Sequence, residues 1–165
     1  MSRAVGLEWA SSGAPIRMWY LLASGGVISL VNFSIHALMT ALIILATRHT
    51  SRVTGEMNML VRLSSLLIVT LSVLMCAHVV EIAVWCLYYD LIGLKIINGT
   101  NFEFAFENYT ALGYGDALPA DISNRLVGPI TSLNGVLLIG WSVAVIFEVM
   151  RVADLHFGHI RRGAN

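Results

Sequence analysis

Thr110-Ala111-Leu112-Gly113-Tyr114-Gly115-Asp116 is a short polar stretch with two glycines, and it lies between two apolar segments. Each flanking segment is long enough to cross a lipid bilayer. Gly113 and Gly115 accept backbone conformations that are forbidden to residues with a Cβ. Successive carbonyl oxygens can therefore be turned to one side, where a row of them can replace the water around a cation.

This stretch resembles the selectivity-filter signature of potassium channels, Thr-Val-Gly-Tyr-Gly-Asp. Glu107 precedes Asp116 by nine residues, which is the spacing of the buried Glu and Asp that brace the filter in prokaryotic two-helix potassium channels. Gly135 and Gly140 fall where those channels carry inner-helix glycines. The resemblance extends over about residues 60–152, leaving the first third of the chain uncovered.

The resemblance implies passive conduction of dehydrated K⁺ through rings of backbone carbonyl oxygens. The K⁺-binding filter residues that it implies are Thr110, Ala111, Leu112, Gly113, Tyr114 and Gly115. One chain would supply a quarter of each ring, and the motif is not repeated in the 165 residues, so a homotetramer is implied. We expect no organic cofactor and no metal beyond the permeant K⁺. A glycine-rich re-entrant turn without an ion is the alternative.

Two residues depart from the family signature. Ala111 replaces the threonine whose hydroxyl helps to form the innermost ion site, and Leu112 replaces the valine. Thr110, one position earlier, could compensate in part for the lost oxygen. A weakly selective monovalent cation channel is therefore an alternative to a potassium-selective one.

By the same resemblance, Glu107 and Asp116 support the filter by sharing a proton or a water. Two buried carboxylates that lie close together cannot both stay charged without a large cost in free energy. The alternative is that both are solvated acids at a channel mouth.

The composition predicts a membrane protein: 57% of the residues are hydrophobic and 12% are charged. The formal net charge is zero and there is no basic run, which argues against nucleic-acid binding. No nucleophile, base and orienting group occur together, so an enzyme is not expected. Nor is an organic ligand evident. A non-conducting membrane adaptor or assembly subunit is the rival from another class.

We expect an all-α membrane protein with three transmembrane helices per chain and a re-entrant pore helix and filter between the second and third. The expected segments are an N-terminal segment (1–17), an additional transmembrane helix (18–47), a cytoplasmic connection (48–62), a pore module (63–152) and a cytoplasmic tail (153–165). The expected parts of the pore module are an outer helix (63–89), a pore helix (100–110), the filter (111–116) and an inner helix (123–152).

Local signals support these assignments. Thr100 and Glu103 have the spacing of a capping box that can start the pore helix. Trp85, Tyr88 and Tyr89 suggest an interfacial aromatic group at the end of the outer helix. By analogy with the resembled channels, the chain crosses the cell (inner) membrane several times, with the N-terminus outside and the C-terminus in the cytoplasm.

Polar residues recur on one face of the first expected span at helical steps: Gly25, Ser29, Asn32, His36 and Thr40. That face should meet protein rather than lipid. His78 and Glu81 form an intramembrane polar pair, at the expected depth of Ser29 and Asn32, with His36 somewhat deeper. The pair either fixes the first helix to the channel or senses protons or a metal, although two ligands are too few for a metal site.

The inner helix carries the candidate gating and cavity residues. Gly135 and Gly140 permit either bending or close packing. An apolar stripe at steps of three, four and four could line a cavity that gates by dewetting: Val136, Ile139, Val143 and Phe147. Glu148 and Arg151 are expected to form a surface ion pair. The sequence leaves the gating stimulus open among pH, lipid, tension and constitutive opening.

Overall fold

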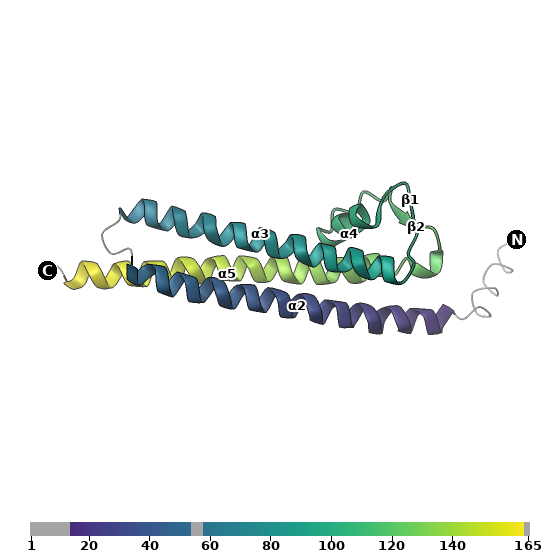
Figure 1. The fold of residues 1–165 in the computed structure, drawn as a ribbon, viewed down its shortest axis with the longest axis horizontal. Helices are drawn as coiled ribbons and strands as arrows, with labels where there is room; N and C mark the ends of the chain where they lie inside the picture. The colour runs from purple at the N-terminus through teal and green to yellow at the C-terminus, as the bar shows by residue number, and fades with distance from the viewer. Residues whose placement is uncertain (1–13, 54–57, 164–165) are drawn as a thin grey trace, which may run out of the picture. The chain divides into compact units, whose positions relative to one another are not determined.

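The computed structural model describes the backbone of residues 14–53 and 58–163, and side chains within residues 15–47 and 58–151. The described chain is mostly helical, as predicted (Figure 1). Its elements are helices α2 (Ala14–Val53), α3 (Met59–Leu91), α4 (Asn101–Tyr109) and α5 (Val127–Gly163), strands β1 (Ile96–Ile97) and β2 (Leu118–Pro119), and a 3₁₀ turn at Ile122–Asn124.

Among the residues that the structure describes, three helical segments are long and apolar enough to cross a membrane, as the sequence predicts. They are Pro15–Thr47, Met59–Leu91 and Ile122–Arg151. A segment of about 20 apolar residues suffices to span the hydrocarbon core. The chain is therefore a multi-pass membrane protein.

The helices extend beyond the apolar segments that were read from the sequence. α2 starts at Ala14 and continues to Val53, within the connection expected at 48–62, and α5 continues to Gly163, within the tail expected at 153–165. Hydropathy marks the part of a helix that lies in lipid, whereas the helix itself can continue into polar turns. Residues 1–13, 54–57 and 164–165 of the expected segments lie outside the described residues.

The chain divides into two compact units, each built from parts of the long helices. The first unit contains residues up to Asn32 together with Ile82–Val136, and the second contains Phe33–Glu81 and the residues from Leu137 onward. In the first unit, α4 and the two strands lie beside the end of α3 and the start of α5 (Figure 1).

An aromatic core fills the first unit. Trp85 and Tyr89 are fully buried and Tyr88 nearly so, so these rings face protein rather than lipid. That they lie at the membrane interface stays a prediction. Their polar atoms have partners on other helices, since Trp85 Nε1 donates to Asn134 Oδ1 at 2.9 Å and Tyr88 Oη lies 2.7 Å from Ser24 Oγ. A buried Tyr or Trp is stable when its polar tip is hydrogen-bonded in this way.

Two polar contacts hold the start of α2 within the first unit. The Arg17 guanidinium donates to Asn124 Oδ1 from Nε at 3.1 Å and Nη2 at 2.7 Å. Asn32 Nδ2 donates to Asn134 Oδ1 at 3.1 Å. The predicted polar face of this helix does meet protein: Gly25, Asn32 and His36 are buried, and Ser29 and Thr40 are partly buried.

An apolar cluster forms the core of the second unit. Its buried members are Ile43, Leu74, Val145 and Val149, with Leu66, Val73 and Ile146 packed against them. They come from α2, α3 and α5, so each long helix contributes to this core.

α5 begins later than the sequence suggests. Asp121 caps the 3₁₀ turn by accepting from the Ser123 amide at 2.9 Å, and α5 starts at Val127 rather than at the expected residue 123. Pro129 therefore occupies the first turn of α5. An N–H is not needed there, because the first amides of a helix have no partner within the helix.

Candidate functional site

Helix α4 begins with the capping box that the sequence predicts. Thr100 Oγ1 accepts from the Glu103 amide at 3.1 Å, and Glu103 Oε2 accepts from the Thr100 amide at 2.7 Å. These two bonds satisfy amides that have no partner inside the helix, so they fix where α4 starts.

α4 ends in a tight turn at the start of Thr110–Asp116, which we call the filter stretch. The Ala111 amide donates to Asn108 O, and the Leu112 amide donates to Glu107 O, both at 2.9 Å. This pair of bonds is a Schellman motif, which requires a left-handed residue at Ala111. Ala111 has φ of 55°, a conformation that glycine adopts more easily than alanine.

Left-handed residues alternate with ordinary ones along the filter stretch. Ala111, Gly113 and Gly115 have φ of 55°, 60° and 80°, whereas φ is not positive at Leu112 and Tyr114. Alternating backbone handedness turns successive peptide groups the same way, which places their N–H groups on one side and their carbonyls on the other. The glycines in this motif therefore meet a specific conformational need.

The filter stretch is open in the single chain. Every residue from Thr110 to Asp116 is exposed, and the Tyr114 side chain is 72% exposed. A Cβ added to Gly113 or Gly115 would meet no atom of the described residues within 4 Å. The two glycines are thus required by backbone conformation rather than by crowding from the same chain.

The end of α4 packs directly against α5. A Cβ on Gly135 would lie 1.9 Å from Tyr109 O, and one on Gly128 would lie 2.6 Å from Asn108 Oδ1. Contacts under 3.0 Å are essentially never seen for a real Cβ. At Gly135 the neighbour is main chain, so only glycine fits there, whereas a Cβ at Gly128 would require the Asn108 side chain to move. Of the two interpretations of Gly135, the structure supports close packing. Gly140, in contrast, would meet no described atom within 4 Å.

The chain that leaves the filter stretch is tied to the chain that enters α4. Strands β1 and β2 pair antiparallel, with Ile96 opposite Pro119 and Ile97 opposite Leu118. The Ala120 amide also donates to Lys95 O at 2.8 Å. The loop that carries the filter stretch is therefore closed at its base by main-chain hydrogen bonds.

One carboxylate, Glu107, precedes the filter stretch, and another, Asp116, is its last residue. Desolvation, followed by the negative charges of Asp116 and Glu103, raises the pKa of Glu107 above its ordinary value of 4.5. Glu107 is partly buried and Asp116 is exposed. That the two carboxylates support the filter by sharing a proton or a water stays a prediction.

Comparison with known proteins identifies the segment that contains these features. The family model described as "Ion channel" matches residues 75–152. Shal, a potassium voltage-gated channel protein of Drosophila melanogaster, is 42% identical over 59 residues, which are 32% of this chain and 10% of Shal. Residues 75–152 are therefore similar to an ion-channel family. We refer to them below as the pore module.

These comparisons cover only part of each protein. The chain spans about a tenth of the length of Shal. No solved structure matches the chain. The pore module contains the end of α3, all of α4, the filter stretch and most of α5. The matched family is one of ion channels rather than enzymes.

The predicted cavity stripe lies on α5 within the pore module. Each of its apolar members is exposed in the single chain: Val136, Ile139, Val143 and Phe147. That they line a cavity stays a prediction. The predicted surface ion pair is confirmed, since Arg151 Nη2 lies 2.7 Å from Glu148 Oε1 and both side chains are exposed.

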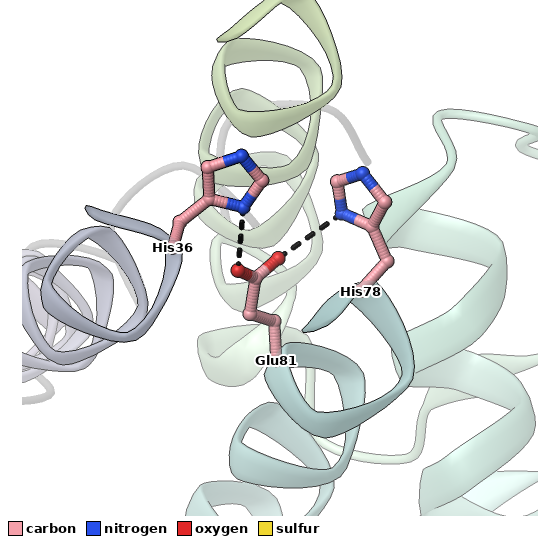
Figure 2. Close-up of side chains that lie close together, drawn as sticks. All are labelled: His36, His78 and Glu81. Atoms are coloured by element: carbon pink, nitrogen blue, oxygen red, sulfur yellow. Dashed lines mark hydrogen bonds and ion pairs between the residues drawn. The ribbon is translucent and has the colours of Figure 1, made fainter. Parts of the chain in front are cut away.

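The predicted polar pair of His78 and Glu81 is present, and it has a further member. His78 Nδ1 lies 3.1 Å from Glu81 Oε2, and His36 Nδ1 lies 2.8 Å from Glu81 Oε1 (Figure 2). The expected depth match with Ser29 and Asn32 is wrong by about one helical turn. Hydropathy fixes neither the tilt nor the axial stagger of neighbouring helices, and the partner depends on both.

Proposed function

We propose that the chain is one subunit of a homotetrameric, potassium-selective channel that conducts K⁺ passively. The observation that carries this proposal is the alternation of left-handed residues at Ala111, Gly113 and Gly115. Carbonyl oxygens aligned by this alternation would replace the hydration shell of K⁺. The ion-binding residues in this proposal are Thr110, Ala111, Leu112, Gly113, Tyr114 and Gly115.

The exposure of the filter stretch supports an assembly of several copies. A ring of ligands around an ion needs oxygens from all sides, and one chain carries the motif once. The stretch from Thr110 to Asp116 is exposed in the single chain. Four copies around an axis would place these residues, and the exposed stripe on α5, around a common path.

The orientation of α4 supports a cation rather than an anion. The C-terminal end of a helix carries a partial negative charge of about half an elementary charge. α4 ends at Tyr109, and the filter stretch follows at once. The helix therefore directs its negative end toward the residues that would hold the ion, and Glu107 with Asp116 would support them.

The test is K⁺ flux into liposomes that contain the purified full chain. We expect flux from the natural sequence and a loss of at least about tenfold in Gly113→Ala, because φ of 60° at this position is strained for a residue with a Cβ. Gly26→Ala, in α2 and outside the pore module, is the control, since an added Cβ meets no described atom there. Absence of flux from the natural sequence would favour the non-conducting adaptor.

A weakly selective cation channel is the second candidate, and Ala111 favours it. The methyl group at this position offers no oxygen to an ion, whereas the resembled channels carry a threonine. The reversal potential in mixed K⁺ and Na⁺ separates the two candidates. A value near the K⁺ equilibrium potential supports selectivity, and a value near zero supports the weakly selective channel.

We place the channel in the cell (inner) membrane with its N-terminus outside and its C-terminus in the cytoplasm. Three spans put the two ends of the chain on opposite sides of the membrane. A membrane-impermeant protease added to intact cells should remove an N-terminal epitope tag and spare a C-terminal one. The reverse pattern would contradict the orientation.

A further inference from the structure

Two imidazoles converge on one carboxylate inside the second unit (Figure 2). His36 comes from α2, while His78 and Glu81 come from α3. One ligand atom from each of the three lies within 4.8 Å of the others. His36 and Glu81 are fully buried, and the His78 side chain is 14% exposed. The sequence offered two ligands on one helix, and the fold adds a third from another.

Ser142 of α5 contacts both imidazoles from the other side. Its Oγ lies 2.9 Å from His78 Nε2 and 3.3 Å from His36 Nε2. Trp141 also packs edge-on against His36, with ring centroids 5.6 Å apart. Each imidazole therefore has one nitrogen at Glu81 and the other at the same hydroxyl group.

One hydroxyl group contacts both imidazoles of this arrangement. If His36 and His78 are neutral and each donates Nδ1–H to the Glu81 carboxylate, both Nε2 atoms are acceptors, and the single Ser142 proton serves one of these two contacts. An additional cation at the cluster, either a proton or a metal ion, gives both contacts between Nε2 and Ser142 Oγ a donor.

With a metal ion at the Nδ1 atoms, both imidazoles would have a partner at each nitrogen. Both imidazoles would then carry their proton at Nε2 and donate it to the two lone pairs of Ser142 Oγ. Histidine ligands of a metal almost always donate their second nitrogen to such a partner, which fixes the tautomer and orients the ring. The position of Ser142 is the one that this pattern requires.

We propose that His36, His78 and Glu81 form a binding site for a divalent transition metal, with Zn²⁺ as the probe, and that Ser142 orients the two imidazoles. In a tetrahedral zinc site, nitrogen and oxygen ligands lie about 3.3 Å apart. The contacts of 2.8 Å and 3.1 Å to the two oxygens of Glu81 would have to open slightly to admit the ion, and the three ligand atoms, which lie within 4.8 Å of one another, would have to draw together around it. Two imidazoles and a carboxylate suit Zn²⁺ or Fe²⁺, whereas Mg²⁺ and Ca²⁺ prefer oxygen ligands.

The metal would link α2 to α3 next to Ser142 of α5. The Glu81 carboxylate would offset one of the two positive charges of the ion, and the ion would give this buried carboxylate a partner of opposite charge in a membrane-spanning segment. Metal binding also stabilises the folded chain by mass action. The site is independent of conduction, so it can be tested without any measurement of flux.

The experiment is equilibrium dialysis of the purified full chain against Zn²⁺ after removal of metal with a chelator, with bound zinc measured by mass spectrometry. We expect one tightly bound Zn²⁺ per chain. Ser142→Ala should lower the affinity by about 10- to 100-fold, and Ser142→Thr, which keeps the hydroxyl, should restore most of it. Glu81→Gln should weaken binding by more than about 100-fold, beyond the effect of the orienting residue.

Control variants exclude zinc bound elsewhere. His156 and His159 lie in a part of α5 whose side chains are outside the described residues, and the double change to Asn should leave the tight Zn²⁺ in place. X-ray absorption of the zinc-loaded natural chain needs no variant that could misfold, and it should show imidazole nitrogen and oxygen ligands without sulfur.

Three results would overturn the proposal. They are the absence of tight zinc, equal affinity in the natural chain and in Glu81→Gln, and a sulfur ligand in the absorption spectrum. The second and third would place the bound zinc outside the cluster.

Discussion

His36, His78, Glu81 and Ser142 form what we call the His–Glu cluster. The cluster and the filter stretch differ in which chemical groups would bind an ion and in whether those groups are buried. In the filter stretch the groups that we propose to bind K⁺ are main-chain oxygens, the residues are exposed, and two glycines permit the backbone conformation. In the cluster the important groups are side chains, nearly all buried, with partners supplied by three helices of one chain.

This difference shows which chemistry a single chain can complete. The cluster is assembled by the packing of α2, α3 and α5, so one copy suffices. The filter stretch has its conformation in one copy, but a ring of ligands around an ion would need further copies. Changes at the two regions should therefore differ in kind: those at the cluster alter the stability of the chain, and those at the filter stretch alter assembly and conduction.

The largest effect is expected at Gly135, which positions the filter stretch through α4. Gly135→Ala should destabilise the chain by about 3 kcal/mol or more, because the new Cβ would lie 1.9 Å from Tyr109 O and main chain cannot move aside cheaply. Thermal unfolding in detergent micelles measures this. Gly140→Ala, in open space, should instead stabilise the helix by about 0.5–1 kcal/mol. Equal effects at both glycines would contradict the packing role.

Replacing one carboxylate near each region, Glu81 in the His–Glu cluster and Glu107 near the filter stretch, compares the two regions directly. Glu81→Gln should lower the free energy of unfolding by about 1–3 kcal/mol, because a buried imidazole loses its charged partner. Glu107→Gln, near the open filter stretch, should change it by less than about 0.5 kcal/mol. Denaturant titration of both variants provides the measurement. A larger loss at Glu107 would reverse the contrast between the regions.

The capping box offers a local test of the element that precedes the filter stretch. Thr100→Ala should destabilise α4 by about 1 kcal/mol, since the Glu103 amide loses its acceptor. Thr100→Ser keeps the hydroxyl and should stay within a few tenths of a kcal/mol of the natural chain. Hydrogen exchange of the α4 amides reports the change; equal protection in the two variants would show that the cap is not needed.

A smaller gain in stability is expected at Ala111. Ala111→Gly should raise the free energy of unfolding by about 0.5–1 kcal/mol, because glycine adopts φ of 55° without a steric cost. Ala105→Gly, in the interior of α4, is the matched control and should lower it by about 1 kcal/mol. Thermal unfolding compares them. A loss of stability in both variants would mean that Ala111 is not strained.

The smallest effect is the pH dependence that arises from Glu107. Its pKa is raised above 4.5 in the folded chain, so the folded state holds this proton more tightly than the unfolded state. The resulting stabilisation is complete below pH 4.5 and is lost as the pH rises through the raised pKa. Unfolding curves across this range should show the loss, and Glu107→Gln should abolish it. An unchanged pH profile in the variant would assign the loss to another group.

Much of the fold could be predicted because the signals are local. A run of apolar residues reports a membrane span wherever it packs, and Thr100 with Glu103 reports a helix start from a spacing of three residues. The glycines on either side of Tyr114 indicate left-handed backbone conformations, and this inference requires no knowledge of the residues packed around them. These features depend on residues close together in the sequence.

The features that the sequence could not supply depend on how helices pack. His36 lies on the predicted polar face, but its contact with Glu81 depends on the stagger between α2 and α3. Trp85 and Tyr89 have the composition of an interfacial group, and only the position of α5 shows that they are buried. For Gly135, bending and packing have the same sequence signal, and the nearby Tyr109 main chain distinguishes them.

The contact between Gly135 and Tyr109 has main chain on both sides. Side chains can absorb a small displacement by changing rotamer, but peptide groups in two helices have no such freedom. Any shift or rotation of α5 at Gly135 must therefore move the last residue of α4, and with it the peptide planes that begin at Ala111. α5 and the filter stretch are therefore coupled through a rigid contact between main-chain atoms.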